Sequence, residues 1–292
     1  MFLDEFSQKI GLCPEAAAYL KQTYLHIRDT DAFVRQTKAI ENGTDFMRLD
    51  EDCTPTAEAL GIHRYTYWMA LLCGNFPLMQ KRYREAGFDD ALIWETAIDF
   101  RCKLEECKRV FGLWGIFPFD WYQRFFEATL FKLGRLEFER LSDGSIKIHI
   151  PSCGPMPHEE LLDSYRKAYA FFGGKDGALL PFLCSTYLLY PPYQKTVFTE
   201  GSNIDRFASD FTIIRVDEKP EFYDCWRVFD RFYSPELSSF PQETSLQKRF
   251  ISYMKENDHH GTGLGLFLFD GQNVHNERTE VFERIAAQYQ NP

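Results

Sequence analysis

The apolar and polar positions follow one pattern in the first part of the chain and another in the rest. Up to about residue 125, apolar residues recur at spacings of three and four, as in PEAAAYLKQTYLHI and TDAFVRQTKAI, and this period predicts amphipathic helices. A longer helix is predicted in DDALIWETAIDFRCKLEECKRVFG, because its aspartate pair suits an N-cap and Gly112 suits the end. The first part is therefore predicted to be a helical bundle.

From about Gly134 the pattern changes to short alternating segments that are typical of strands. RLEFERL and SIKIHIP lie on either side of Asp143-Gly144, a favoured turn pair, and predict a β-hairpin. A helix is predicted from about Pro157 to Phe172, and a buried strand in ALLPFLCSTYLLY.

The remaining segments predict a mixed order of helices and strands. Strands are expected in FTIIRVD and GTGLGLFLFD, and helices in SNIDRFASDF, PEFYDCWRVFDRFY and TSLQKRFISYMKEN. We therefore predict an α/β (α+β) fold in which a helical domain, residues 1–125, packs on a mixed-sheet domain, residues 126–292.

The break in IKIHIPSCGPMPHEELLDSYRKAYAFF has a chemical interpretation. A strand that stops at Pro151 and passes through Ser152, Cys153 and Gly154 into a helix presents backbone N–H groups at the positive end of the helix dipole. The glycine permits close approach, and the prolines that follow fit near a first helical turn. This pattern predicts an anion site, with phosphate as the favoured guest. The alternative is a junction that only turns the chain.

Several segments together resemble a bacterial family of two-domain proteins: LGRLEFER, HIPSCGP, HEELLDSYRKAYAFF, FLCSTYLLYPP and TSLQKRF. In that family a helical N-acyltransferase N-terminal domain precedes a GNAT-like C-terminal domain. The resemblance covers most of the chain, including GIFPFDWYQRFFEATLFKLGRLEFER. It implies transfer of an acyl group from acyl-CoA, acetyl-CoA or longer, to a small-molecule or peptide amine by direct attack, with acyl-CoA as co-substrate and no metal.

The resemblance also implies where the cofactor binds. The pyrophosphate is expected at the SCGPMP loop, at Ser152, Cys153, Gly154 and Met156, and the pantetheine arm between the IKIHIP and FLCSTYLL strands. The usual GNAT loop is basic, whereas SCGPMP has one glycine and no arginine. Relatives carry His-Ser-Trp where this chain has Ser185-Thr186-Tyr187, so no role of that histidine is transferred. These departures leave an alternative function, a non-catalytic GNAT-fold protein that binds a ligand or a partner.

Direct acyl transfer requires a group that takes the amine proton and an acid that protonates the leaving thiolate. His149 is the first candidate base, because it shares a strand face with Lys147 at the end of IKIHIP. Glu137 on the partner strand is the second. The alternative for these residues is ordinary cross-strand ion pairing, in which Glu139 also takes part.

Tyrosines follow the central strand and supply the candidate acids. Tyr190 or Tyr193 is expected to protonate the thiolate; the alternative is that they are packing residues with hydrogen-bonded hydroxyls.

The eight cysteines, none in a C-x-x-C pair, are predicted to be reduced thiols. A second mechanistic hypothesis makes Cys153 a nucleophile, because a thiol at a helix N-terminus near His149 or His158 has a lowered pKa.

The composition and the hydropathy pattern argue against nucleic-acid and membrane partners. A net charge of −10 disfavours a nucleic-acid binder. The acidic N-terminus lacks the features of a signal peptide and no apolar run is long enough for a membrane span, so we expect a cytoplasmic protein without a membrane contact. GTGLG is predicted to be a close-packed strand start rather than a dinucleotide loop, and His259-His260 a solvated turn rather than a metal site.

Overall fold

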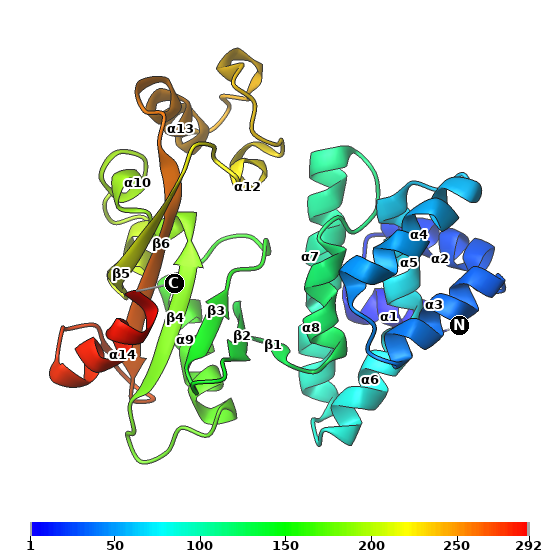
Figure 1. The fold of residues 1–292 in the computed structure, drawn as a ribbon, viewed down its shortest axis with the longest axis horizontal. Coiled ribbons are helices and arrows are strands. Elements are labelled where there is room, and N and C mark those ends of the chain that lie inside the picture. Colours follow the sequence, from blue (N-terminus) through cyan, green and yellow to red (C-terminus); the bar gives the residue numbers. More distant parts are fainter. Residues whose placement is uncertain (1, 291–292) are drawn as a thin grey trace. The chain divides into compact units, whose positions relative to one another are not determined.

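The structure is a computed structural model that describes residues 2–290. The chain divides into two compact units, shown in Figure 1, and each is described by itself. The first contains Met1–Lys132 and the short segment Pro151–Cys153, and the second contains Leu133–Ile150 and Gly154–Pro292.

The first unit is helical, as its pattern predicts. The long helix α7 has Asp89 as N-cap, whose side chain accepts a hydrogen bond from the Leu92 amide, and ends at Gly112, which has a left-handed φ of 73°. Short η1 and α8 then lead to the first strand. The elements are α1 (Phe2–Lys9), α2 (Pro14–Ile27), α3 (Asp31–Glu41), α4 (Phe46–Ala59), α5 (Arg64–Gly74), α6 (Phe76–Glu85), α7 (Asp90–Phe111), η1 (Phe119–Tyr122), α8 (Gln123–Phe126) and β1 (Leu130–Leu133).

Aromatic side chains fill the core of the helical unit. Phe6 of α1 lies between Phe76 of α6 and Phe100 of α7, with ring centroids 4.8 and 5.5 Å away. Trp68 of α5 stacks on Phe119 at 4.4 Å. Such rings bury a large apolar area, and their contacts fix how α1, α5, α6 and α7 pack.

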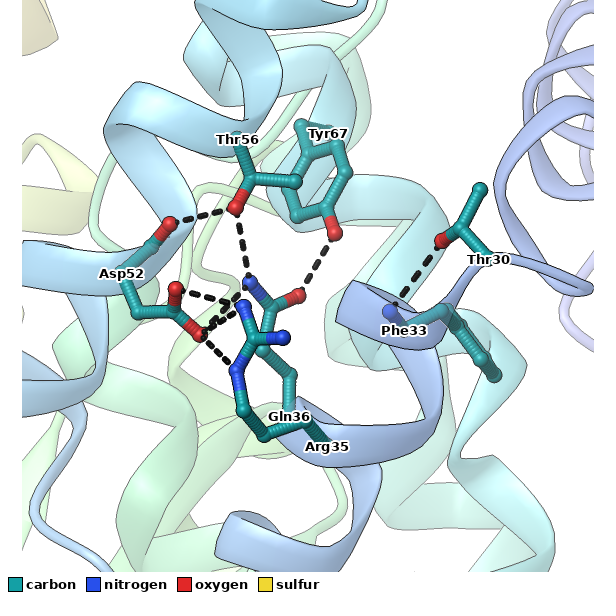
Figure 2. A network of polar contacts seen from close by, with 7 residues as sticks. All are labelled: Thr30, Phe33, Arg35, Gln36, Asp52, Thr56 and Tyr67. Carbon is teal, nitrogen blue, oxygen red and sulfur yellow. Dashed lines mark hydrogen bonds and ion pairs between the residues drawn. The ribbon is translucent and has the colours of Figure 1, made fainter.

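A polar network ties three helices of this unit together (Figure 2). Gln36 of α3 is fully buried; its amide nitrogen donates to Asp52 at 3.2 Å and Thr56 at 3.4 Å, both on α4, and its oxygen accepts from the Tyr67 hydroxyl of α5 at 2.6 Å. Arg35 also donates to Asp52, at 2.7 Å. Each polar atom of Gln36 has a partner, so the buried amide is fully satisfied.

The second unit is built on a mixed sheet. From β2 onward its strand order is β2-β3-β4-β6-β5, and β7 pairs with β6. The predicted hairpin is confirmed, because β2 and β3 are antiparallel, whereas β3 and β4 are parallel. β6 is antiparallel to β4, β5 and β7. The strands are β2 (Leu136–Arg140), β3 (Ile146–His149), β4 (Leu180–Thr186), β5 (Thr212–Lys219), β6 (His260–Phe269) and β7 (Val274–His275).

Two helices cover the two faces of this sheet. Tyr165 of α9 packs on Phe182 of β4 and Phe267 of β6, with centroids 6.1 and 4.9 Å away. On the other face, Phe282 of α14 belongs to a cluster with Leu183 of β4. Successive residues of β4 therefore point to opposite layers. The helices of this unit are α9 (His158–Phe171), η2 (Tyr187–Leu189), α10 (Pro191–Thr196), α11 (Asn203–Ser209), α12 (Cys225–Phe229), η3 (Leu237–Ser239), α13 (Ser245–Glu256) and α14 (Glu280–Gln290).

Three segments differ from the predictions. PEFYDCWRVFDRFY contains only the short α12, because Phe222 stacks on Phe250 of α13 at 4.8 Å and Asp230 has a left-handed φ of 51° that ends the helix. ALLPFLCSTYLLY leaves the strand conformation at Thr186 and continues as η2. After β6 the chain forms β7 and α14, which the pattern did not predict.

The GTGLG segment is a close-packed strand start, as predicted. A Cβ on Gly263 would lie 2.1 Å from the Leu189 carbonyl oxygen, and one on Gly265 would lie 2.8 Å from the Leu189 side chain. The chain after β4 therefore rests on the glycine face of β6. The predicted solvated turn is wrong for His260, which is only 2% exposed as the first residue of β6.

Candidate functional site: the junction between β3 and α9

The two central parallel strands pair over a short distance. β3 pairs with β4 at Ile146↔Phe182 and Lys147↔Leu183, and in the described residues the pairing stops there, although β3 continues to His149. β4 remains paired with β6 as far as Thr186↔Gly263. The end of β3 therefore parts from β4 just before the chain enters the loop that leads to α9.

The loop ends in a helix terminus without a side-chain cap. The N-cap position of α9 is Pro157, whose side chain accepts no hydrogen bond. Within residues 2–290, the amides of Gly154, Met156, His158 and Glu159 donate to no protein acceptor, whereas the next two amides of α9 donate to the Pro157 carbonyl. These four N–H groups lie at the positive end of the α9 dipole. They are the backbone donors that an anion site requires.

An arginine from outside the loop fixes the loop's shape. Arg135, just before β2, donates from Nε to the Pro155 carbonyl at 2.8 Å and from Nη2 to the Gly154 carbonyl at 2.7 Å. Its side chain is buried, and burial lowers its pKa. In a trans peptide the N–H points opposite to the C=O, so the Met156 amide points away from the guanidinium. The arginine missing from SCGPMP is thus supplied by another segment, where it holds carbonyl groups.

The first two loop residues are tied to α7. The Ser152 hydroxyl donates to the Glu106 carboxylate, and Cys153 forms a disulfide with Cys102, with Cα atoms 5.5 Å apart. The Cys153 amide donates to the Pro151 carbonyl. The prediction of reduced thiols is therefore wrong for this pair, and the hypothesis of a nucleophilic Cys153 thiolate is wrong for the disulfide form. The Met156 side chain is buried, so only the Met156 amide is available to an anion at the loop.

The candidate bases lie together on the β2–β3 hairpin. Glu137 is the register partner of His149, and Glu139 that of Lys147. His149 Nε2 lies 2.8 Å from the Glu139 carboxylate, and Lys147 Nζ lies 3.4 Å from it, so the cross-strand pairing is present. Glu137 is 1% exposed. The hairpin therefore brings an imidazole and two carboxylates to one strand face.

The candidate acids are buried after β4. Tyr190 and Tyr193 are 1% and 0% exposed, and their rings meet edge to face at 4.8 Å. Burial raises the pKa of Tyr190 to about 12 and also raises that of Tyr193, so both phenols stay protonated at neutral pH.

The Tyr193 hydroxyl has a partner that the sequence did not identify. It lies 2.8 Å from Nδ1 of His260, and its oxygen also accepts from the Gly261 amide. The tautomer of His260 decides which of the two groups donates in this contact. Burial lowers the pKa of His260. The sequence does contain one indication of this role. His260 directly precedes an apolar strand, and an imidazole at that position is placed inside the unit.

A second histidine network lies at the first residue of α9. His158 Nε2 is 2.9 Å from the Asp210 carboxylate, which also accepts from the Tyr165 hydroxyl at 3.2 Å. Asp210 is buried, which raises its pKa, while the His158 contact opposes that shift. Asp210 directly follows α11 and lies 52 residues from His158 along the chain, so no local pattern in the sequence indicates this pair. This network anchors the start of α9.

Residues 2–290 contain neither a metal-binding cluster nor a helix that could span a membrane. No group of three or more His, Cys, Asp and Glu side chains is arranged to hold a metal ion in that range. Its helices also lack the combination of length and apolar character that a bilayer span requires.

The chain matches two domain families in series. Residues 1–128 match the N-acyltransferase N-terminal domain, and residues 130–267 match the GNAT-like C-terminal domain. The chain belongs to this two-domain acyltransferase architecture. The predicted resemblance is thereby confirmed, and the loop described above lies within the GNAT-like domain.

Solved structures with the same fold are acyltransferases. One, in complex with decanoyl-CoA and teicoplanin, is 21% identical with a TM-score of 0.73 over 91% of this chain and 87% of that one. A mutant acyltransferase in complex with octanoyl-CoA is 20% identical with a TM-score of 0.71, covering 90% and 86%. A third, with CoA and 10C-teicoplanin, is 24% identical with a TM-score of 0.60, covering 68% of this chain and 65% of that one, just under two thirds of its length. No curated protein matches this chain.

Proposed function

We propose that the protein is an acyl-CoA-dependent N-acyltransferase that transfers an acyl group to an amine by direct attack. The observation that carries this proposal is the set of four backbone amides, from Gly154 to Glu159, that have no acceptor in the protein. Among these residues Met156 is buried, His158 is half-buried, and Gly154 and Glu159 are exposed, so a ligand can reach the terminus from solvent. Here the donors are left for an anion, and the diphosphate of CoA is the anion that the GNAT-like domain suggests.

The loop residues then have distinct roles. Gly154 and Met156 present amides to the diphosphate, while Ser152 and Cys153 hold the start of the loop through α7. The pantetheine arm lies along the end of β3, where pairing with β4 has stopped.

The chemistry requires one bond to form and one to break. The amine nitrogen attacks the thioester carbonyl carbon, and the carbon–sulfur bond breaks to release the CoA thiolate. His149 accepts the amine proton; with its own proton on Nε2 and shared with Glu139, the basic lone pair is on Nδ1. Glu137 is the second candidate base. Tyr190 or Tyr193 donates a proton to the thiolate, and the phenolate that forms takes a proton back from solvent once the CoA thiol has left.

The acceptor is proposed as a small-molecule or peptide amine. The structural relatives were solved with acyl-CoA and with teicoplanin, which supports a co-substrate with a medium-length acyl chain. The acidic net charge argues against nucleic acid. We place the reaction in the cytoplasm of a bacterial cell, the compartment that supplies acyl-CoA.

Calorimetry with acetyl-, octanoyl- and decanoyl-CoA tests the proposal, and Gly154→Ala is the decisive variant. Gly154 has a φ of +91°, so alanine would shift the loop backbone and its amides. We expect at least a tenfold loss of affinity, which is about 1.4 kcal/mol.

The chain supplies a matched control. Gly144, in the β2–β3 turn, has a φ of +90°, and like Gly154 it has no atom within 4 Å of an added Cβ. Gly144→Ala therefore carries the same backbone strain and is expected to keep full affinity. Equal affinity of both variants and the unchanged protein would rule out the loop as the diphosphate site, and an absence of heat with all three acyl-CoAs would favour a non-catalytic binding protein.

A further inference from the structure

The bond between Cys102 and Cys153 lies at the entrance of the proposed acyl-CoA loop. Cys153 directly precedes Gly154, the first residue with an amide that has no protein acceptor, and Cys102 lies in the middle of α7. The two cysteines are 51 residues apart in the sequence, so the disulfide closes a long loop of chain. A cross-link of this kind removes conformational freedom from the segment that it closes.

The two cysteine residues differ in exposure. Cys102 is 1% exposed, whereas Cys153 is half-buried. An incoming thiolate therefore reaches the Cys153 sulfur, and the Cys102 sulfur is the leaving group. Among the free cysteines of residues 2–290, only Cys13 is exposed, and burial raises the pKa of Cys107 and Cys184 to about 12. The Cys102–Cys153 pair is thus the place in this range where exchange with a small thiol meets little competition.

The Ser152–Glu106 hydrogen bond remains when the disulfide opens. Ser152 donates to Glu106, which is 1% exposed and forms an ion pair with Lys103 at 3.3 Å. Cys102 and Glu106 are four residues apart on α7, so the covalent and the polar contact come from one face of that helix. Opening the disulfide leaves the loop start held by the hydrogen bond without the covalent bridge.

We infer that Cys102 and Cys153 are a thiol–disulfide exchange site that sets how firmly the loop is held and, resting on the proposed function, how tightly acyl-CoA binds. In the disulfide form the amides after Cys153 are pre-organised, which lowers the entropic cost of binding. In the dithiol form the loop is less ordered before binding, so the entropic cost of ordering it weakens acyl-CoA binding. The proposed location, the cytoplasm, is a reducing compartment. Disulfides there are characteristically transient or redox-sensing, which agrees with an exchange site and not with a permanent structural disulfide.

The exchange balances with a low-molecular-weight thiol of the glutathione class. A first thiolate attacks the Cys153 sulfur, forms a mixed disulfide there, and releases the Cys102 thiolate, which takes up a proton. A second thiolate attacks the small-molecule sulfur of the mixed disulfide and releases Cys153. The protein gains two electrons and two protons, and two small thiols become one small disulfide.

The test uses the full chain in two glutathione buffers, one mostly reduced and one mostly oxidised. Intact mass after alkylation reports the redox state, calorimetry with octanoyl-CoA reports affinity, and hydrogen exchange of residues 151–158 reports loop order without any ligand. We expect about tenfold tighter binding and slower loop exchange in the oxidised form, within the usual range of coupling between sites.

Variants separate the pair from the other thiols. The double variant Cys102→Ser, Cys153→Ser is expected to bind like the reduced protein in both buffers, while Cys13→Ser keeps the full response. If the two forms of the unchanged protein, verified by mass, show the same loop exchange and the same affinity, the inference is overturned. If the loop responds but neither form binds acyl-CoA, the exchange site stands and the proposed function fails.

Discussion

The helices α9 and α13 of the second unit begin in opposite ways. At α13, the Thr244 hydroxyl accepts from the Gln247 amide at 3.1 Å, and the Gln247 side chain accepts from the Thr244 amide at 3.1 Å, which is a complete capping box. At α9 the N-cap residue is Pro157, which offers no side-chain acceptor. The first turn of α13 is therefore completed within the protein, whereas the first amides of α9 have no acceptor among residues 2–290.

Within one domain, the cap of α13 contributes to stability, whereas the uncapped end of α9 belongs to the candidate site. A cap typically contributes about 1 kcal/mol to stability. The α9 terminus forgoes that contribution, as do α2, α6, α10 and α12, whereas α3, α7, α11 and α13 have side-chain caps. At α9 the uncapped terminus also adjoins a loop whose carbonyl groups are held by Arg135, which supports the loop before α9 as the functional end of the unit.

The largest expected effect comes from removing the arginine that shapes the open terminus. Arg135→Leu leaves the carbonyls of Gly154 and Pro155 without their charged donor. We expect the free energy of unfolding to fall by about 3 kcal/mol, because hydrogen bonds to charged groups are strong and their loss is costly in a buried site. Acyl-CoA affinity is expected to fall about thirtyfold, as measured by calorimetry.

Arg140→Leu is the matched control for that experiment. Arg140 lies on β2 and donates to the carbonyl of Phe172, at an exposed position away from the loop. Its loss is expected to change stability by about 0.5 kcal/mol and to leave affinity unchanged. If Arg135→Leu keeps full affinity while remaining folded, the guanidinium does not position the donor amides.

A second variant converts the open terminus into a capped one. Pro157→Asp adds a carboxylate at the N-cap position, where the backbone is already extended with φ of −60° and ψ of 134°. We expect a gain of about 1 kcal/mol in unfolding free energy and about tenfold weaker acyl-CoA binding, because the carboxylate occupies the amides and repels phosphate.

Pro157→Ala removes the proline without adding an acceptor. It is expected to keep its affinity within about twofold, since the amides of α9 remain open. Equal affinities for the Asp and Ala variants in calorimetry would contradict the assignment of these amides to the diphosphate.

Half of this contrast was readable in the sequence. S-C-G-P-M-P followed by a helix predicts open amides at α9, whereas the pattern of TSLQKRFISYMKEN predicts the helix α13 without its capping box. The two domain types, the hairpin and the close-packed glycines of β6 were predicted on similar local grounds. Local patterns determine which groups lie at a helix end.

The contacts that shape the site depend on segments far apart in the chain. Arg135 meets the loop across 20 residues, Asp210 meets His158 across 52, and Cys102 meets Cys153 across 51. Neither periodicity nor turn chemistry contains those pairings. The expectation of reduced cysteines failed for this reason, because spacing alone does not say which two thiols approach within bonding distance.

The capped helix allows the converse experiment. Thr244→Ala removes the acceptor of the Gln247 amide and breaks the capping box. The unfolding free energy measured in urea is expected to fall by about 1 kcal/mol, with no change in acyl-CoA affinity. Thr244→Ser keeps the hydroxyl and is expected to restore most of the loss. A parallel drop in affinity would mean that the two termini are not independent.

The smallest expected effect concerns pH at the end of the unit that includes α13. Tyr253 of α13 packs 5.8 Å from the His260 ring, whose pKa is lowered by burial. Between that lowered value and about 6.5 the unfolded chain binds more protons than the folded one, so stability falls as pH drops through this window and is unaffected above it. The slope cannot exceed one proton, about 1.4 kcal/mol per pH unit.

His260→Asn is expected to flatten that slope in urea unfolding measured from pH 5 to 8, because asparagine does not titrate. His26→Asn serves as the control, since His26 is exposed on α2 in the helical unit and its loss leaves the buried imidazole in place. The donors at α9 are amides that do not titrate in this range, so acidification should weaken the fold near α13 without removing them. An unchanged slope in His260→Asn would show that some other group causes the acid sensitivity.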